Sequence, residues 1–198
     1  MNKLITIVGP SGVGKTALVR ALSKTGTFMT ALEEHTARPF QTPAKEDIRY
    51  VLANQMDYLL LRAEQEGQLR AASKFGLMDG GLDLDFHGFT RLFLHRNLLQ
   101  QNEFDLCRRF YLFARDLLPC PELIVRLNAD EGTVADRLSR RQRINIASAA
   151  DTAFFNTFLD DWLSTVPPRH VLELDITEEQ IEYTQSVQAI LDTIRKIF

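Results

Sequence analysis

The sequence has little cysteine and no long apolar run. Only Cys107 and Cys120 occur among 198 residues, and they lack CxxC or CxxH spacing. They are therefore expected to be reduced thiols in core or helix-surface positions rather than a zinc site or a redox pair. No apolar run approaches the roughly 18 residues of a membrane span, and the short run at 4–8 has no signal-peptide pattern after it. These absences predict a cytoplasmic protein.

An excess of positive charge is also absent. The chain has 23 Lys and Arg against 26 Asp and Glu, which gives a net charge of −3. Such a chain has no global basic field to hold nucleic acid or an anionic membrane. It also lacks repeats, low-complexity stretches and Pro/Gly-rich linkers, so residues 1–198 are expected to form a single domain.

Strand and helix signals alternate along the whole chain. Strands are predicted at 4–8, 28–32, 75–79, 123–127 and 171–174. Helices are predicted at 15–24, 45–68, 82–99, 103–117, from 130 onward, and at 152–164 and 178–197. Strands separated by helices favour right-handed crossovers and a parallel sheet with helices on both faces. The predicted fold class is therefore a three-layer α/β architecture.

The segment between the first strand and the first helix matches the phosphate-loop pattern GxxxxGK[ST]. Its residues are Gly9, Pro10, Ser11, Gly12, Val13, Gly14, Lys15 and Thr16. The glycines let backbone amides turn onto a phosphate, and the helix N-terminus adds a favourable dipole. Lys15 can reach the β- and γ-phosphates, and the Thr16 hydroxyl can ligate magnesium. The pattern predicts binding of ATP with Mg²⁺.

Other nucleotide-binding classes fit the sequence poorly. The guanine-reading NKxD of GTPases is absent, and the DxxG match at 85–88 is short enough to arise by chance. The third strand ends in Asp79 followed by Gly80, without the adjacent acids of AAA-type ATPases. Asp79 lies where a parallel sheet places ligand chemistry, so it is predicted to hold magnesium, directly or through water; a helix N-cap is the alternative.

With these motifs, the chain resembles the deoxynucleoside kinase family over nearly its whole length, in particular the bacterial deoxyadenosine/deoxyguanosine kinase-like branch. Residues 32–40, Leu-Glu-Glu-His-Thr-Ala-Arg-Pro-Phe, look like the family's stretch after the second strand. The resemblance implies that Glu33 is the general base for the nucleoside 5′-hydroxyl. Glu34 stands where the family often has proline, so the two glutamates could exchange roles.

Residues 50–62 resemble the family's long base-reading helix. The match assigns Gln55 to the base edge, because a carboxamide offers both a donor and an acceptor. It places Asp85 as a second base-reading group and Phe89 as an aromatic face near the base, with Arg62 on the substrate side. A surface glutamine and a plain core phenylalanine are the structural alternatives.

Residues 123–143 resemble the strand and helix that lead into the family's arginine-rich lid, here about 137–148. Arg137, Arg141 and Arg143 match its arginines, and Arg140 is extra. Guanidinium groups suit the spread charge of a transferring phosphoryl group, and lid closure would exclude water. The alternative is a solvated basic helix face.

The chain departs from the family pattern at two places. Asp79 is followed by Gly80-Gly81 instead of the usual Arg-Ser, so an arginine that reaches the phosphates and the general base is absent. Arg62 or a lid arginine is the candidate substitute. The lid also has Ile144-Asn145-Ile146 where a glutamate commonly follows.

The resemblance implies an ATP-dependent kinase that transfers the γ-phosphoryl group to the 5′-hydroxyl of a deoxynucleoside. It also implies a homodimer, to which the apolar helices from Ile48 and Leu92 could contribute. Two alternatives remain open: a P-loop kinase for another small molecule, such as a sugar acid, and an ATP-binding regulatory module that has lost turnover.

Overall fold

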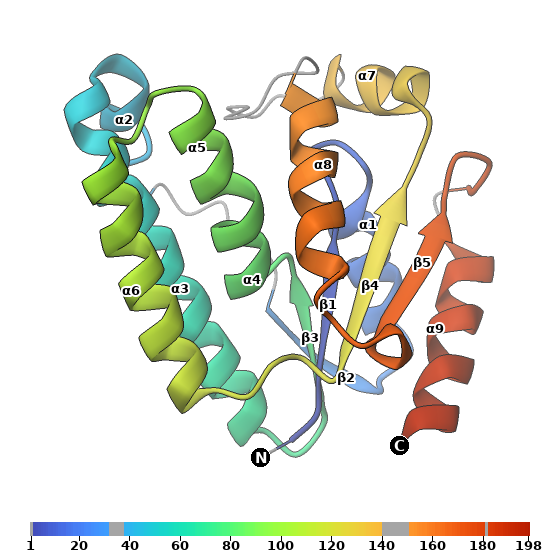
Figure 1. Cartoon of the computed structure of the whole chain (residues 1–198). Coiled ribbons are helices and arrows are strands. Elements are labelled where there is room, and N and C mark those ends of the chain that lie inside the picture. Colours follow the sequence, from blue (N-terminus) through green and yellow to red (C-terminus); the bar gives the residue numbers. More distant parts are fainter. Residues whose placement is uncertain (1, 32–37, 140–150, 181) are drawn as a thin grey trace.

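The computed structural model describes residues 2–31, 38–139, 151–180 and 182–198. Its five strands form one parallel sheet in the order β2-β3-β1-β4-β5 (Figure 1). The strands are β1 (Leu4–Val8), β2 (Phe28–Ala31), β3 (Phe75–Asp79), β4 (Leu123–Asn128) and β5 (Val171–Asp175). The predicted parallel α/β sheet is confirmed.

Because β1 is the central strand, the phosphate loop that follows it lies in the middle of the carboxyl end of the sheet. All five residues of β1 are buried, as expected for a parallel strand covered on both faces. Ile7 pairs with Asp79 of β3 on one side and with Val125 of β4 on the other. The carboxyl ends of β1 and β3 therefore lie together, where open α/β sheets bind ligands.

Helices cover both faces of the sheet. On one face, α1 (Lys15–Ser23) and α9 (Thr184–Ile197) bury Leu18, Leu22 and Ile190 against strand residues such as Ile5 and Ile7. The other face is covered by α3 (Val51–Ala71), α8 (Thr152–Leu163) and a composite helix of α4 (Leu82–Leu84), η2 (Asp85–Thr90) and α5 (Arg91–His95). The three-layer prediction is confirmed.

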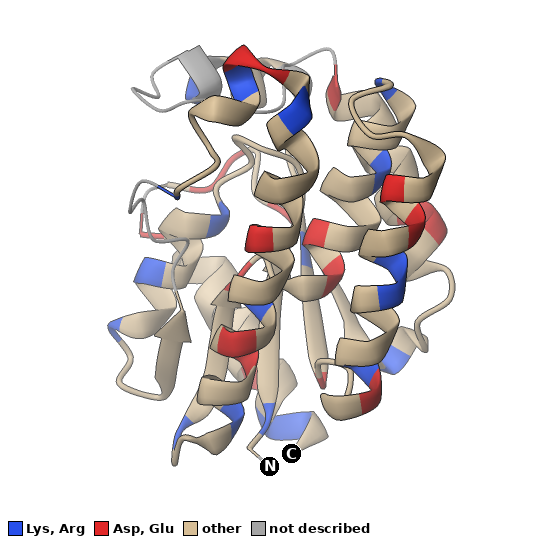
Figure 2. Ribbon diagram, turned by 90° about the vertical axis from the view of Figure 1, so that its left-hand side faces the viewer, with Lys and Arg blue, Asp and Glu red and all other residues tan. Residues whose placement is uncertain are grey.

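Some of the described helices lie outside these layers. The helix α6 (Gln101–Leu117) packs on α3 and forms the outer wall at the left of Figure 1. The helix α7 (Glu131–Ser139) lies above the carboxyl end of β4. On the α3 and α6 side, Lys and Arg positions are interspersed with Asp and Glu positions (Figure 2). Within the described ranges, no helix is both long enough and apolar enough to cross a membrane.

The predicted helix over 45–68 is divided in the structure. A short α2 (Pro43–Glu46) and a 3-10 turn, η1 (Ile48–Tyr50), precede α3. Asp47 separates them because its backbone is extended, with φ −144° and ψ 118°, and its side chain accepts a hydrogen bond from the Arg49 amide. An Asp that caps the next turn competes with helix continuation.

Two other predicted helices have different limits. The helix predicted over 82–99 contains the π-helical η2 and ends at His95, and the chain then turns at Asn97 with φ 54°. The helix predicted over 178–197 begins only at Thr184, because Tyr183 adopts a left-handed conformation with φ 51°. Left-handed residues interrupt a right-handed helix.

Candidate active site

The phosphate loop has the backbone geometry that its glycines predict. Gly9, Gly12 and Gly14 have φ values of 145°, 86° and 116°, a region that side-chain-bearing residues rarely adopt. A Cβ at Gly9 would lie 2.8 Å from the Leu127 carbonyl oxygen. The Lys15 Nζ donates to the carbonyl oxygens of Gly9 and Pro10, at 2.9 Å each. The ammonium group is thus held over the loop.

Asp79 and Thr16 meet beside this loop. The Thr16 hydroxyl donates to Asp79 Oδ2 at 2.5 Å, and Asp79 is 1% exposed. The other carboxylate oxygen, Oδ1, is buried and has no hydrogen-bond partner among the described residues. A hydroxyl and a carboxylate with an unpaired buried oxygen are hard ligands that fit a magnesium ion. The N-cap alternative is not supported, because Gly81 precedes α4.

The predicted base-reading groups lie together between α3 and η2. The Gln55 amide nitrogen donates to the Asp85 carbonyl oxygen at 3.1 Å and to the Thr90 hydroxyl at 2.8 Å. Thr90 in turn donates to the same carbonyl oxygen at 2.9 Å. Gln55 is 2% exposed, so the surface-glutamine alternative is wrong. These bonds use both amide hydrogens of Gln55, which leaves its oxygen as an acceptor.

Arg62 joins this cluster about two turns after Gln55 on α3. Its Nε lies 2.9 Å from Asp85 Oδ2, and both side chains are almost fully buried. Its Nη1 donates to Gln65 at 3.1 Å. A Cβ built on Gly80 would lie 3.6 Å from Arg62 Nη2. Gly80 stands where most family members have an arginine. Among the described arginines, Arg62 therefore lies beside the position of that missing side chain.

Phe89 is partly buried against the core. Its ring meets Phe155 of α8 edge to face, with centroids 5.0 Å apart, and it packs on the cluster that includes Leu92 and Leu159. Phe89 therefore makes the core contacts that the structural alternative, a plain core phenylalanine, predicts.

One predicted lid arginine lies within the described residues. Arg137 of α7 donates from Nη1 to the Val13 carbonyl oxygen in the phosphate loop, at 2.7 Å, and from Nη2 to the Ile176 carbonyl oxygen, at 3.4 Å. The predicted Glu33, Arg140, Arg141 and Arg143, with most of the lid, fall outside the described residues.

Two residues that border the site, and one ion pair on α3, were not predicted from the sequence. Thr90 holds the Gln55 amide. Tyr183 is 4% exposed, and a Cβ at Gly14 would lie 2.5 Å from its hydroxyl; burial raises the pKa of this phenol. Arg38 binds Asp57 of α3 through two bonds of 2.6 Å. Thr90 and Tyr183 lie in no motif, and Arg38 has no assigned role in the stretch 32–40 that resembles the family, so these contacts required the folded chain.

Comparisons with known proteins identify the family and the fold. The deoxynucleoside kinase family model matches residues 5–198. The chain is 22% identical over 202 residues to the deoxyadenosine/deoxycytidine kinase of Bacillus subtilis (strain 168), covering 99% of this chain and 93% of that protein.

Solved structures give the same fold. Deoxyadenosine kinase from M. mycoides with the products dCMP and a flexible dCDP has a TM-score of 0.79 at 19% identity, covering 98% of this chain and all of that one. The same kinase with bound dATP has a TM-score of 0.78 at 18% identity, covering 97% and 99%. Because the family model spans nearly the whole chain, this protein belongs to the deoxynucleoside kinase family, whose members are phosphotransferases acting on a hydroxyl group.

Proposed function

We propose that this deoxynucleoside kinase uses ATP and Mg²⁺ to phosphorylate the 5′-hydroxyl of deoxynucleosides whose base carries an amino group, with deoxyadenosine and deoxycytidine as the first candidates. The observation that carries the proposal is the buried cluster of Gln55, Arg62, Asp85 and Thr90, in the same chain as an intact phosphate loop. The names of the B. subtilis and M. mycoides proteins support the same pair of bases.

The base preference follows from which groups accept hydrogen bonds. Asp85, paired with Arg62, presents carboxylate oxygens, and Gln55 has its amide hydrogens engaged by Thr90 and the Asp85 backbone. A pocket rich in acceptors favours a base edge that donates, as the exocyclic amino groups of adenine and cytosine do. Thymine has no amino group and offers a single N–H donor.

The catalytic roles are divided between the loop, the third strand and the lid. Lys15 and the lid arginines Arg137, Arg141 and Arg143 would hold the phosphates, and Glu33 would accept the proton of the attacking hydroxyl. Thr16 and Asp79 would hold magnesium, which supplies charge neutralisation at the phosphates. Phosphoryl transfer depends mostly on such positioning and electrostatic stabilisation. Because these reactants are cytosolic metabolites, we place the enzyme in the cytoplasm.

The test is a phosphoryl-transfer assay with ATP, magnesium, and the deoxynucleosides and ribonucleosides of each base, scoring monophosphate beside nucleoside-free ATP hydrolysis. Deoxyadenosine and deoxycytidine are expected to give most product. Lys15→Ala should lower kcat/KM by about 100-fold or more, the usual loss when a transition-state charge contact is removed. Lys24→Ala, an exposed lysine next to the end of α1, is the matched control.

Two outcomes of this assay would contradict the proposal. Product from thymidine alone would remove the acceptor argument for the base. Binding of ATP with no monophosphate from any nucleoside would favour the regulatory module, for which the Gly80-Gly81 sequence is the supporting observation. A sugar-acid panel run beside the nucleosides tests the remaining small-molecule alternative.

We also propose a homodimer formed through α6. Leu106, Phe113 and Leu117 follow each other at helical spacing on α6 and are 43%, 61% and 61% exposed, and Leu60 of the adjacent α3 is 46% exposed. Of the two helices expected to contribute, the one from Ile48 begins with a side chain that is 53% exposed, whereas Leu92 itself is fully buried. An apolar stripe of this kind is typical of a protein interface.

The dimer is tested by sedimentation equilibrium. Phe113→Glu is expected to convert a dimer into a monomer, because it places a charge in the apolar stripe. Phe154→Glu, which changes a 48% exposed phenylalanine on α8, should leave the mass unchanged. A wild-type chain that sediments as a monomer at all concentrations would contradict the dimer.

A further inference from the structure

A cavity lies near the amino end of β4, at the end of the sheet opposite the phosphate loop. It has a volume of about 380 Å³, and Pro121, Glu122 and Ile124 form the wall next to β4. Asp83, His87 and Tyr111 line its inner part, while the exposed Cys120 also lines it. None of its lining residues belongs to the phosphate loop or to the base-reading cluster. Its size falls in the range of pockets that bind small organic molecules.

The buried carboxylate of Asp83 is the polar group that a ligand would meet there. Asp83 is 5% exposed, and its Oδ1 accepts a bond from the Tyr111 hydroxyl at 2.8 Å. The same Oδ1 lies 3.1 Å from Arg115 Nε, which has no hydrogen bond of good geometry. Oδ2 has no partner among the described residues, so one carboxylate oxygen is available in the cavity wall.

The charges around this carboxylate do not balance. Arg115 makes its short contact with Glu66, at 2.6 Å, and Arg70 is shared between Glu66 and Glu122, at 3.1 and 3.2 Å. Three carboxylates therefore face two guanidinium groups, which leaves a net charge of −1. Glu66 and Glu122 accept hydrogen bonds from these arginines, whereas Asp83 has only the 3.1 Å contact with Arg115 Nε, which is not a hydrogen bond. A buried charge without full compensation favours a cationic partner.

The remaining polar lining adds no positive charge. Among the described lining residues none is Lys or Arg. Burial lowers the pKa of His87 to about 4, so its ring is neutral at physiological pH. His170 accepts a bond from the exposed Arg169 at Nε2 and lies 2.9 Å from the Glu122 carbonyl oxygen through Nδ1, a pattern that fits a neutral ring. Arg91, whose positive charge also lowers the pKa of His87, forms an ion pair with Asp161.

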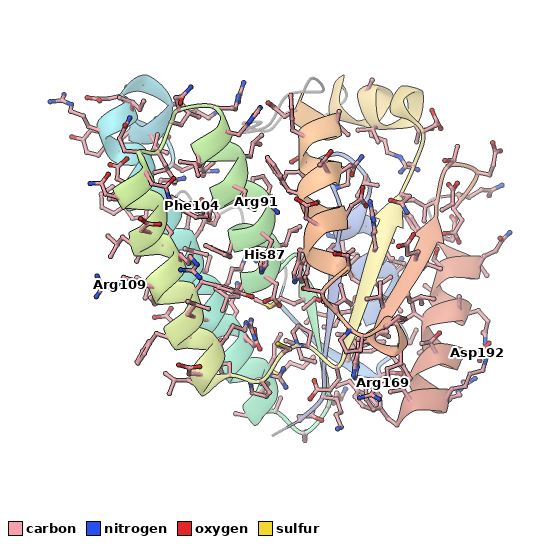
Figure 3. All side chains as sticks on the ribbon, in the orientation of Figure 1. His87, Arg91, Phe104, Arg109, Arg169 and Asp192 are labelled. Carbon is pink, nitrogen blue, oxygen red and sulfur yellow. The ribbon has the colours of Figure 1, made fainter. Side chains whose placement is uncertain are left out.

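The cavity walls are flat and partly apolar. His87 stacks on Trp162 of α8 with ring planes 3° apart, and Figure 3 places His87 between the α4–α5 segment and α8. Ile124 and Val166 add aliphatic surface. No group of three or more His, Cys, Asp and Glu suited to a metal ion occurs in the described part of the chain. An organic cation therefore suits this cavity better than a metal ion.

We propose that this cavity is a second binding site, separate from the kinase site, for a small planar organic cation of the amidine, guanidine or aromatic amine class. The charged N–H groups of the ligand donate to Asp83 Oδ2, and its flat body packs against the Trp162, Ile124 and Val166 wall.

The test compares benzamidinium with benzamide, its neutral analogue of nearly the same shape, by protein-observed NMR titration. Deoxyadenosine is present throughout to occupy the nucleoside site. Benzamidinium is expected to bind about tenfold more tightly than benzamide, with an affinity on the order of millimolar. Asp83→Asn should abolish this preference, and Asp192→Asn, on the distant α9 (Figure 3), should retain it.

A second measurement does not depend on the Asp83 variant folding well. Cys120 is exposed and lines the cavity, whereas Cys107 is buried. Benzamidinium should slow alkylation of Cys120 by iodoacetamide about threefold at a concentration of twice its Kd, because occupancy then reaches about two thirds. Equal affinity for the cation and the neutral amide, binding unchanged in Asp83→Asn, or an unprotected Cys120 would overturn the proposal.

Discussion

At the scale of single residues, the base-reading cluster depends on a hydroxyl that no motif contains. Thr90 is fully buried, and its hydroxyl accepts a hydrogen bond from the Gln55 amide and donates one to the Asp85 carbonyl oxygen. Without that acceptor, the carboxamide could rotate and exchange its donor and acceptor. Thr90 is therefore a positioning residue for Gln55.

Thr90→Val is expected to raise KM for deoxyadenosine and deoxycytidine about tenfold, since one hydrogen bond is worth about 1 kcal/mol and the amide also loses its fixed orientation. Steady-state kinetics with both nucleosides and thymidine measures the change, and discrimination against thymidine should narrow. Thr90→Ser keeps the hydroxyl and should retain the wild-type KM. If Thr90→Ser raises KM and Thr90→Val leaves it unchanged, the methyl group of Thr90, and not its hydroxyl, determines nucleoside binding.

Asp79 offers a second prediction at this scale. Asp79→Asn can keep the bond from Thr16 but removes the charge of the buried carboxylate. We expect kcat to fall by about 100-fold and the magnesium concentration for half-maximal rate to rise, because a neutral amide is a weaker ligand for a hard cation. A magnesium titration of the rate measures both effects. An unchanged magnesium requirement would assign Asp79 to holding Thr16 alone.

At the scale of elements, η2 is held against α8 at Gly88. A Cβ on Gly88 would lie 2.5 Å from the Phe155 ring, whereas a Cβ on Gly67, inside α3, would meet nothing within 4 Å. Gly88→Ala should therefore destabilise the protein by about 1–3 kcal/mol through overpacking. Gly67→Ala should stabilise it by about 0.5–1 kcal/mol, because alanine loses less backbone entropy in a helix.

Urea unfolding of the two variants measures these effects. Kinetics add a second reading, because η2 also carries Asp85 and Phe89: Gly88→Ala should raise KM for the nucleoside, and Gly67→Ala should not. Similar stability changes in the two variants would show that contact with Phe155 does not decide the packing of η2.

The strands and the phosphate loop were predictable because local patterns determine them. The limits of β1 and β3 follow from short apolar runs that begin after a lysine and end before a glycine, and the loop follows from its motif. The divisions at Asp47 and Tyr183, and the π-helical turn before Arg91, were not predicted, because they depend on single side chains and on packing that apolar periodicity does not encode. Gln55 and Asp85 were placed together by resemblance, but Thr90 required the folded chain.

At the scale of the whole molecule, stability should depend on pH through His87. Its pKa is lowered from 6.5 to about 4, mainly by burial and secondarily by Arg91 and Arg115. Between these values the unfolded chain binds a proton that the folded chain does not, so falling pH favours unfolding. Burial raises the pKa of Asp83, which acts in the opposite direction.

The effect of His87 is isolated by comparing the wild type with His87→Gln. The free energy of unfolding of the wild type should fall between pH 7 and pH 5 by about 1–2 kcal/mol more than that of the variant. Urea unfolding at the two pH values gives this difference, from which pH-independent effects of the substitution cancel. Equal pH dependence in the two proteins would mean that His87 takes up a proton equally in both states.

The position of β1 at the centre of the sheet has a consequence for synthesis. Its two partners, β3 and β4, begin at Phe75 and Leu123, so neither neighbour exists when the first strand leaves the ribosome. At about 5–20 residues per second, the wait until β4 has been translated lasts roughly 6–24 seconds. Both edges of this apolar strand stay open until β3 has been made, and the edge that pairs with β4 stays open throughout the interval, so the strand is exposed to other chains while the phosphate loop after it lacks the complete sheet.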